Sequence, residues 1–116
     1  MPDTETVLEV RRPSERAAII AVRGELTGAT DGPLMDAYGR ATDPSTRVVV
    51  LDFSELEYMN STGIGLLVTL LVRAQRHRQR LMAYGLSAHY REILSLTRLD
   101  EAIGVVNSEA EALTGA

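Results

Sequence analysis

Apolar residues along this chain recur in short runs that alternate between the spacing of strands and the spacing of helices. The first two runs, residues 6–12 and 17–23, flank the turn signal Pro13-Ser14-Glu15, so they predict an antiparallel pair of strands. Three later runs predict further strands over residues 47–53, 81–86 and 102–106. The unbroken stretch from Val48 to Leu51 is typical of a central strand covered on both faces.

Helical spacing separates the later strands. The first helix is predicted from about Pro33, a residue that suits a first helical turn, and ends before Asp43. A second is predicted over residues 61–78. Its expected core stripe is Ile64, Leu67, Val68 and Leu71. Leu66, Leu70 and Val72 are surplus apolar residues, and some of this surplus is interpreted as partner contact. Ser87 is predicted to cap a third helix, and Ser108 with Glu111 matches the capping box of a last helix that reaches Leu113.

This alternation predicts a single α/β domain over residues 1–116, with its core from about residue 6 to residue 114. We expect a mixed β-sheet of about five strands, an initial antiparallel pair followed by parallel strands, packed with about four helices. The strands at residues 47 and 81 should be parallel and joined through the second helix by a right-handed crossover. In such sheets functional groups gather beyond the carboxyl ends of the parallel strands.

Composition narrows the classes of function. The formal net charge is −4, which disfavours nonspecific binding of nucleic acid or of an anionic membrane. All 12 basic residues are arginine, so a Schiff-base lysine and the lysine of a phosphate-binding loop are excluded. Without cysteine there is no disulfide or thiolate metal site, and two histidines make any metal site unpersuasive. Neither a signal peptide nor an apolar run of membrane-spanning length is evident, so we expect a cytoplasmic protein with protein partners.

Ser61 is the most informative position, because it stands where a strand and a polar turn run into an apolar helix. The first N–H groups of a helix lack acceptors and carry partial positive charge, so a phosphoryl group on Ser61 could be held there without unfolding. Gly63 and Gly65 sharpen this interpretation, since each costs roughly 1 kcal/mol against alanine inside a helix and would let a partner backbone approach. The alternative is structural: Asn60 or Ser61 is an ordinary N-cap, and the glycines fit the helix under a neighbouring strand.

The stretch LDFSELEYMNSTGIGLLV, from Leu51 to Val68, resembles the central motif of the STAS domain family, in particular the bacterial anti-sigma factor antagonists. Gly24-Glu25-Leu26, followed by Thr30, is similar to the family's turn into its first helix, and the likeness runs from about residue 7 to residue 113. The resemblance implies that Ser61 is phosphorylated by an anti-sigma factor that is itself a serine kinase, and dephosphorylated by a serine phosphatase. It implies no cofactor.

By the same resemblance, the unphosphorylated chain binds that kinase and so releases a sigma factor. The implied partner-binding residues are Glu25, Thr27, Asn60, Ser61, Thr62, Gly63, Gly65 and Leu66. The chain departs from the family's pattern twice, with Asn60 and Thr27 where aspartate is usual. Both changes remove a negative charge from this surface, which favours either altered kinase recognition or the loss of phosphorylation. In the second case the chain would be a STAS scaffold or accessory subunit in a stress-signalling or lipid-transport complex.

We do not expect an enzyme. The dinucleotide fingerprint begun by Gly63 fails because its third glycine is replaced by Val68, and a nucleophile elbow at Ser61 fails because Met59 stands where glycine is needed. A triad of Ser61 with His77 or His89 stays open at this stage, although nothing orders those residues.

Charged residues cluster on both sides of the candidate site. The acidic run of Asp52, Glu55 and Glu57 is either a solvated loop or a rim that complements a basic patch on a kinase. The basic cluster is Arg73, Arg76, His77, Arg78 and Arg80; it lacks interleaved aromatic residues and suits the negative end of a helix dipole. Between the acidic run and Ser61, Tyr58 and Met59 are expected to anchor the loop in the core.

Overall fold

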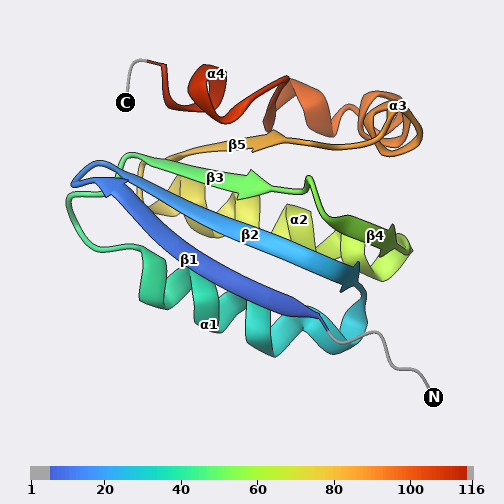
Figure 1. The fold of residues 1–116 in the computed structure, drawn as a ribbon, viewed down its shortest axis with the longest axis horizontal. Helices are drawn as coiled ribbons and strands as arrows, with labels where there is room; N and C mark the ends of the chain where they lie inside the picture. Colours follow the sequence, from blue (N-terminus) through green and yellow to red (C-terminus); the bar gives the residue numbers. More distant parts are fainter. Residues whose placement is uncertain (1–5, 115–116) are drawn as a thin grey trace.

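The structure, a computed structural model, describes residues 6–114. Six strands form one mixed sheet (Figure 1): β1 Val7–Ser14, β2 Ala17–Leu26, β3 Val48–Asp52, β4 Leu56–Met59, β5 Arg80–Tyr84 and β6 Gly104–Val106. Their order is β1-β2-β3-β5-β6, with β4 paired to β2. The first two strands are antiparallel and all later pairings are parallel, which confirms the predicted arrangement.

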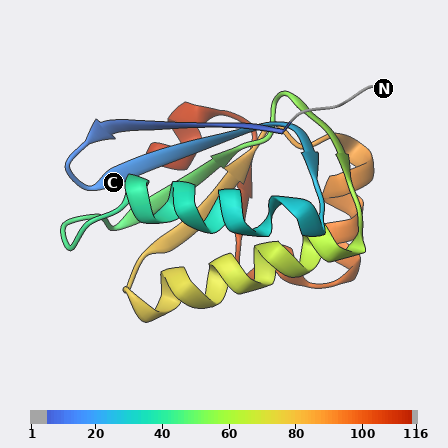
Figure 2. The same ribbon diagram turned by 90° about the horizontal axis from the view of Figure 1, so that it is seen from below.

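The helices cover both faces of the sheet. They are α1 Asp31–Ala41, α2 Ser61–Arg76, α3 Ala88–Leu96 and α4 Glu109–Leu113, with short 3₁₀ turns η1 at Gly28–Thr30 and η2 at Leu99–Glu101. Figure 2 shows α1 and α2 side by side against one face. Ala112 of α4 packs with Ile19 and Val50, whose side chains point to the other face. Within residues 6–114, no helix is long and apolar enough to cross a membrane.

The central position of β3 follows from its four leading residues. Val48, Val49, Val50 and Leu51 are each at most 1% exposed. Successive side chains point to opposite faces, so a run this apolar is stable only where helices or other elements cover both. The prediction of a central strand is confirmed.

The strand β4 was not predicted. It pairs with the last part of β2, so that Glu25 lies opposite Tyr58 and Leu26 opposite Met59. The first part of β2 pairs with β3 instead. A four-residue strand carries little local signal, and long-range pairing with β2 defines it. Met59 is buried as expected, but Tyr58 is 48% exposed, so its assignment to the core was wrong.

The buried face of α2 differs from the predicted stripe. The buried residues are Gly63, Leu66, Leu67, Leu70, Leu71 and Ala74. Val68, predicted in the core, is 41% exposed, while Leu70, one of the surplus apolar residues, is 0% exposed. Leu67 and Leu71 are buried as predicted, and Ile64 packs against the core. Apolar residues extend so far round the helix that periodicity could not fix the whole buried face.

The helix α2 also ends earlier than predicted, at Arg76 instead of residue 78. Arg78 takes a left-handed conformation with φ of 58°, and its N–H donates to the carbonyl of Gln75 at 3.1 Å. The N–H of Gln79 donates to the carbonyl of Ala74 at 2.9 Å. This pair of bonds is a Schellman motif, which ends a helix and turns the chain toward β5.

Candidate functional site

Asn60 is the N-cap of α2. Its backbone is extended, and its side-chain Oδ1 accepts a hydrogen bond from the N–H of Gly63 at 2.9 Å. Its own carbonyl accepts from the N–H of Ile64 at 3.0 Å, and its N–H donates to the carbonyl of Leu26 at 3.3 Å. Asn60 therefore joins the start of α2 to the carboxyl end of β2. The interpretation of Asn60 as an ordinary N-cap is correct. Because Asn60 caps the helix, the side chain of Ser61 is not needed for capping.

Ser61 is the first residue of α2, and its side chain is exposed. Within residues 6–114 its hydroxyl forms no hydrogen bond, and the N–H groups of Ser61 and Thr62 precede the first intrahelical bond. An exposed oxygen thus lies beside two free N–H donors at the positive end of the helix dipole. This arrangement stabilises an anion, including a phosphoryl group carried by that oxygen.

The loop after β2 lies against this helix start. Thr27 donates its N–H to Oγ1 of Thr30 at 3.2 Å, and that hydroxyl donates to the carbonyl of Glu25 at 3.2 Å. Gly28 then passes so close to Thr62 that a Cβ on the glycine would lie 3.1 Å from Cγ2 of Thr62. The fold therefore brings Glu25, near the end of the ladder between β2 and β4, and Thr27, just after β2, to the same end of the sheet as Ser61.

Two residues of the predicted partner surface are inside the molecule. A Cβ on Gly63 would overlap the carbonyl oxygen of Leu26 and lie 3.0 Å from Cγ of Met59, so this glycine lets α2 pack under β2. Leu66 is only 7% exposed. Gly65, in contrast, is exposed, and a Cβ there would meet nothing within 4 Å.

Tyr58 is a further exposed residue at this end of the sheet. It stands opposite Glu25 in the ladder between β2 and β4 and is 48% exposed. Sequence reasoning missed it because its exposure depends on β4, which has no clear local signal. The N–H of the next residue, Met59, donates to the hydroxyl of Tyr90 at 2.9 Å, so α3 helps to hold this strand in place.

The acidic run ahead of Ser61 does not form a single rim. Glu55 is 3.5 Å from Arg23, and Oδ1 of Asp52 accepts from the hydroxyl and the N–H of Ser54 at 2.6 and 2.9 Å. Burial would raise the pKa of the Asp52 carboxyl, but the bonds from Ser54, together with smaller effects of Tyr84 and Arg11, lower it overall. Glu57 is exposed and forms no ion pair within residues 6–114.

The structure gives no support to a catalytic triad of Ser61 with His77 or His89. Ser61 and His77 lie at opposite ends of α2, about 24 Å apart at a rise of about 1.5 Å per residue. His89 lies against Tyr90, with ring centroids 5.0 Å apart, and forms no hydrogen bond with Ser61. Within residues 6–114, neither histidine forms the hydrogen bond to the Ser61 hydroxyl that a general base would need.

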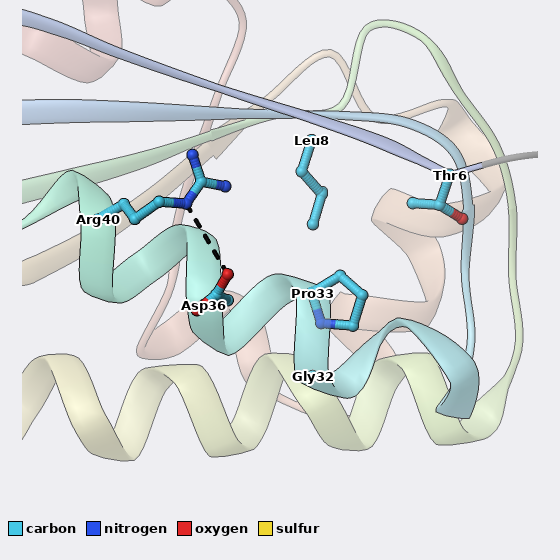
Figure 3. Close-up of a pocket in the computed structure, with 6 residues that line it drawn as sticks. All are labelled: Thr6, Leu8, Gly32, Pro33, Asp36 and Arg40. Atoms are coloured by element: carbon cyan, nitrogen blue, oxygen red, sulfur yellow. Dashed lines mark ion pairs between the residues drawn. The ribbon is translucent and has the colours of Figure 1, made fainter.

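A groove of about 550 Å³ lies between β1 and α1 (Figure 3). Its lining residues are Thr6, Leu8, Gly32, Pro33, Asp36 and Arg40. Asp36 and Arg40 pair across one turn of α1 at 3.9 Å, so their charges largely cancel. The groove contains none of the predicted site residues and presents no convergent catalytic groups.

Asn60→Ala is expected to lower the free energy of unfolding by about 1 kcal/mol, because the N–H of Gly63 loses its acceptor. Urea unfolding followed by circular dichroism measures the change. Asn60→Asp is the matched control: it keeps the acceptor and adds a charge that the helix dipole favours, so it should be at least as stable as wild type. Equal loss in both variants would contradict the capping role.

Comparisons with known proteins agree with this geometry. The anti-sigma-B factor antagonist of Listeria monocytogenes serovar 1/2a is 28% identical over 92 residues, covering 79% of this chain and 81% of that protein. A crystal structure of an anti-sigma factor antagonist from Mycobacterium paratuberculosis has a TM-score of 0.79 at 22% identity, covering 95% of this chain and 92% of that one. The Bacillus cell fate determinant SpoIIAA in its phosphorylated form has a TM-score of 0.67 at 17% identity, covering 93% and 97%.

The two structures establish the likeness of fold, and the family is established by a sequence model. A family model described as "Mlab, STAS domain" matches residues 10–107, which include all of the candidate site and most of the sheet. This chain belongs to the STAS domain family.

Proposed function

We propose that this chain is an anti-sigma factor antagonist whose binding is switched by phosphorylation of Ser61. The observation that carries the proposal is the exposed Ser61 hydroxyl, free of hydrogen bonds within residues 6–114, beside two free N–H groups at the start of α2. The similarity to proteins named anti-sigma factor antagonists, one of them in a phosphorylated form, supports it. The proposal implies a cytoplasmic protein that does not itself bind DNA, a membrane or a cofactor, and that catalyses no reaction.

The unmodified chain would present the exposed end of the sheet to an anti-sigma serine kinase. The proposed contact surface is Glu25, Thr27, Tyr58, Asn60, Ser61, Thr62 and Gly65. Binding occupies the kinase, and the sigma factor is released. Gly63 and Leu66 are left out of this surface because both are buried.

Phosphorylation would reverse this binding by electrostatics. It adds about −1.5 to −2 charges at neutral pH in the middle of the contact surface. The free N–H groups of Ser61 and Thr62 stabilise that charge in the isolated chain, so the domain stays folded. A partner that covers the phosphoryl group without a matching cation must remove its water, which opposes binding by several kcal/mol. A serine phosphatase would restore the binding form.

The test incubates the chain with a candidate anti-sigma kinase and ATP and locates the modification by mass spectrometry. We expect one phosphoryl group on Ser61, none on Ser61→Ala, and wild-type labelling of Ser95→Ala, a control at another exposed serine on a helix. Isothermal titration calorimetry should show that the phosphorylated chain and Ser61→Asp bind the kinase at least 100-fold more weakly than the unmodified chain, in line with a loss of about 3 kcal/mol. Unmodified Ser61 together with unchanged binding by Ser61→Asp would reject the switch.

A second candidate is a STAS scaffold or accessory subunit that is not phosphorylated. Asn60 favours it, because this neutral cap stands where the antagonists that the chain resembles usually carry aspartate. Such a subunit should be found in a large stable complex when its native mass is measured by light scattering. An antagonist should instead exchange between free and kinase-bound forms according to its phosphorylation.

A further inference from the structure

The helix α2 presents an unusual line of residues to solvent. Ser61, Gly65, Val68, Val72 and Arg76 follow one another at intervals of three or four residues, so they share one face of the helix. The buried residues, from Gly63 to Ala74, occupy the opposite face. We name this line the outer α2 stripe; Figure 2 shows α2 as an outer element of the layer that also contains α1.

The composition of the outer α2 stripe is not that of an ordinary solvated face. Residues 61–72 contain no charged side chain, whereas the solvent face of a surface helix normally carries several. Val68 and Val72 are each 41% exposed. Valine and glycine are also weaker helix formers than alanine, so neither stabilises α2 at these exposed positions. Helix stability and contact with water therefore leave these residues unexplained.

The residues at the two ends of the outer α2 stripe indicate the chemistry of a partner surface that would bind it. At one end is the Ser61 site with its hydroxyl and free N–H groups. At the other, about 22 Å away at a rise of about 1.5 Å per residue, the exposed guanidinium of Arg76 forms no salt bridge or side-chain hydrogen bond within residues 6–114. Arg73, one turn earlier, is already placed over the ring of Tyr38, with Cζ 5.1 Å from its centroid. Arg76 is thus the cation that the stripe offers.

We propose that the outer α2 stripe is the docking face for an amphipathic helix of the same kinase that recognises unmodified Ser61. That helix would place apolar side chains over Val68 and Val72, pass close to the backbone at Gly65, and carry a carboxylate opposite Arg76. Charge complementarity at Arg76 and continuity with Ser61 favour this occupant. The inference rests on the proposed function, and it extends the recognised surface about four helical turns beyond the phosphorylation site.

The test measures binding of a purified anti-sigma kinase by calorimetry. Val68→Arg is expected to weaken binding about 30-fold or more, because a charge replaces an apolar contact near the interface centre. Arg76→Glu should weaken it about 10-fold and make the affinity less sensitive to salt. Leu96→Arg is the matched control: Leu96 is 76% exposed and belongs to α3, not to α2, and this variant should bind within about twofold of wild type.

Each outcome separates this inference from the proposed function. If Val68→Arg unfolds in urea like wild type and binds the kinase equally well, while Ser61→Asp still abolishes binding, the docking face is wrong and the switch stands. A wild-type chain that binds no anti-sigma kinase overturns both. A wild-type dimer in light scattering that Val68→Arg dissociates, without any loss of kinase affinity, would assign the stripe to a second copy instead.

Discussion

Gly63→Ala is expected to destabilise the protein by about 3 kcal/mol, although alanine is the better helix former. The added Cβ would overlap the carbonyl oxygen of Leu26 and lie 2.8 Å from its carbonyl carbon. These are backbone atoms of β2, so the clash is relieved only by moving the helix away from the sheet. That movement also stretches the hydrogen bond from Asn60 to the same carbonyl. Overpacking of this kind typically costs about 1–3 kcal/mol, occasionally more, which exceeds the roughly 1 kcal/mol gained from helix propensity.

Gly65→Ala is the matched control two residues later. A Cβ there meets nothing within 4 Å, so only the propensity gain remains, and we expect stabilisation by about 0.5–1 kcal/mol. Urea denaturation of both variants gives the comparison, and opposite signs are the expected result. Similar changes in both variants would show that the contact between Gly63 and Leu26 does not set the packing of α2.

Leu70→Ala is expected to lower the free energy of unfolding by about 3 kcal/mol. Leu70 is 0% exposed in the cluster that α2 forms with the sheet, and truncation of a buried leucine leaves a cavity worth roughly 2–5 kcal/mol. Val72→Ala is its control, because Val72 is 41% exposed and alanine is the better helix former. Its unfolding free energy should lie within about 0.5 kcal/mol of wild type.

Thermal and urea unfolding of this pair determine the rotation of α2 about its axis. A larger loss for Val72→Ala than for Leu70→Ala would mean that the helix packs through the other face. The outer α2 stripe would then be part of the core, and the docking proposal would fail with it.

On the proposed function, α2 combines two roles. Its inner face stabilises the domain through Leu66, Leu67, Leu70 and Leu71, while its outer face is free for recognition. The two faces meet at the first turn, where Asn60 and Gly63 fix the helix and Ser61 remains exposed. A phosphoryl group added there would change the charge of the recognition surface without touching the buried contacts. This separation would let the proposed switch work in a small domain without unfolding it.

On the other face of the sheet, a cluster of polar side chains attaches α4 to the strands. Arg11 lies 2.7 Å from Glu109, and Tyr84 donates its hydroxyl to the same carboxylate at 3.1 Å. The hydrogen bond from Arg11 lowers the pKa of Glu109 although burial opposes it, and burial together with Asp52 raises the pKa of Tyr84. These contacts attach α4 to β1 and β5 on the side opposite α2.

The sequence by itself determined the order of most elements, the antiparallel start of the sheet and the central position of β3. Hydrophobic spacing is a local property, and a run such as Val48 to Leu51 has few stable placements outside a covered sheet. The position of Ser61 at the start of α2 was likewise predictable, because a capping residue followed by an apolar helix marks that boundary.

Tertiary structure alone decided the full extent of the buried face of α2 and which residues surround Ser61. Hydrophobic spacing found part of the buried face, because Leu67 and Leu71 are buried as predicted. Apolar residues extend far round the helix, however, so the close approach of Gly63 to the Leu26 carbonyl and the shape of the sheet select the rest of the inner face. The strand β4 exists only through its pairing with the end of β2, and that pairing brings Glu25 and Tyr58 to the Ser61 end of the molecule. Contacts between residues more than thirty positions apart leave no mark on local spacing, which is why the face of α2 and the full candidate surface required the folded structure.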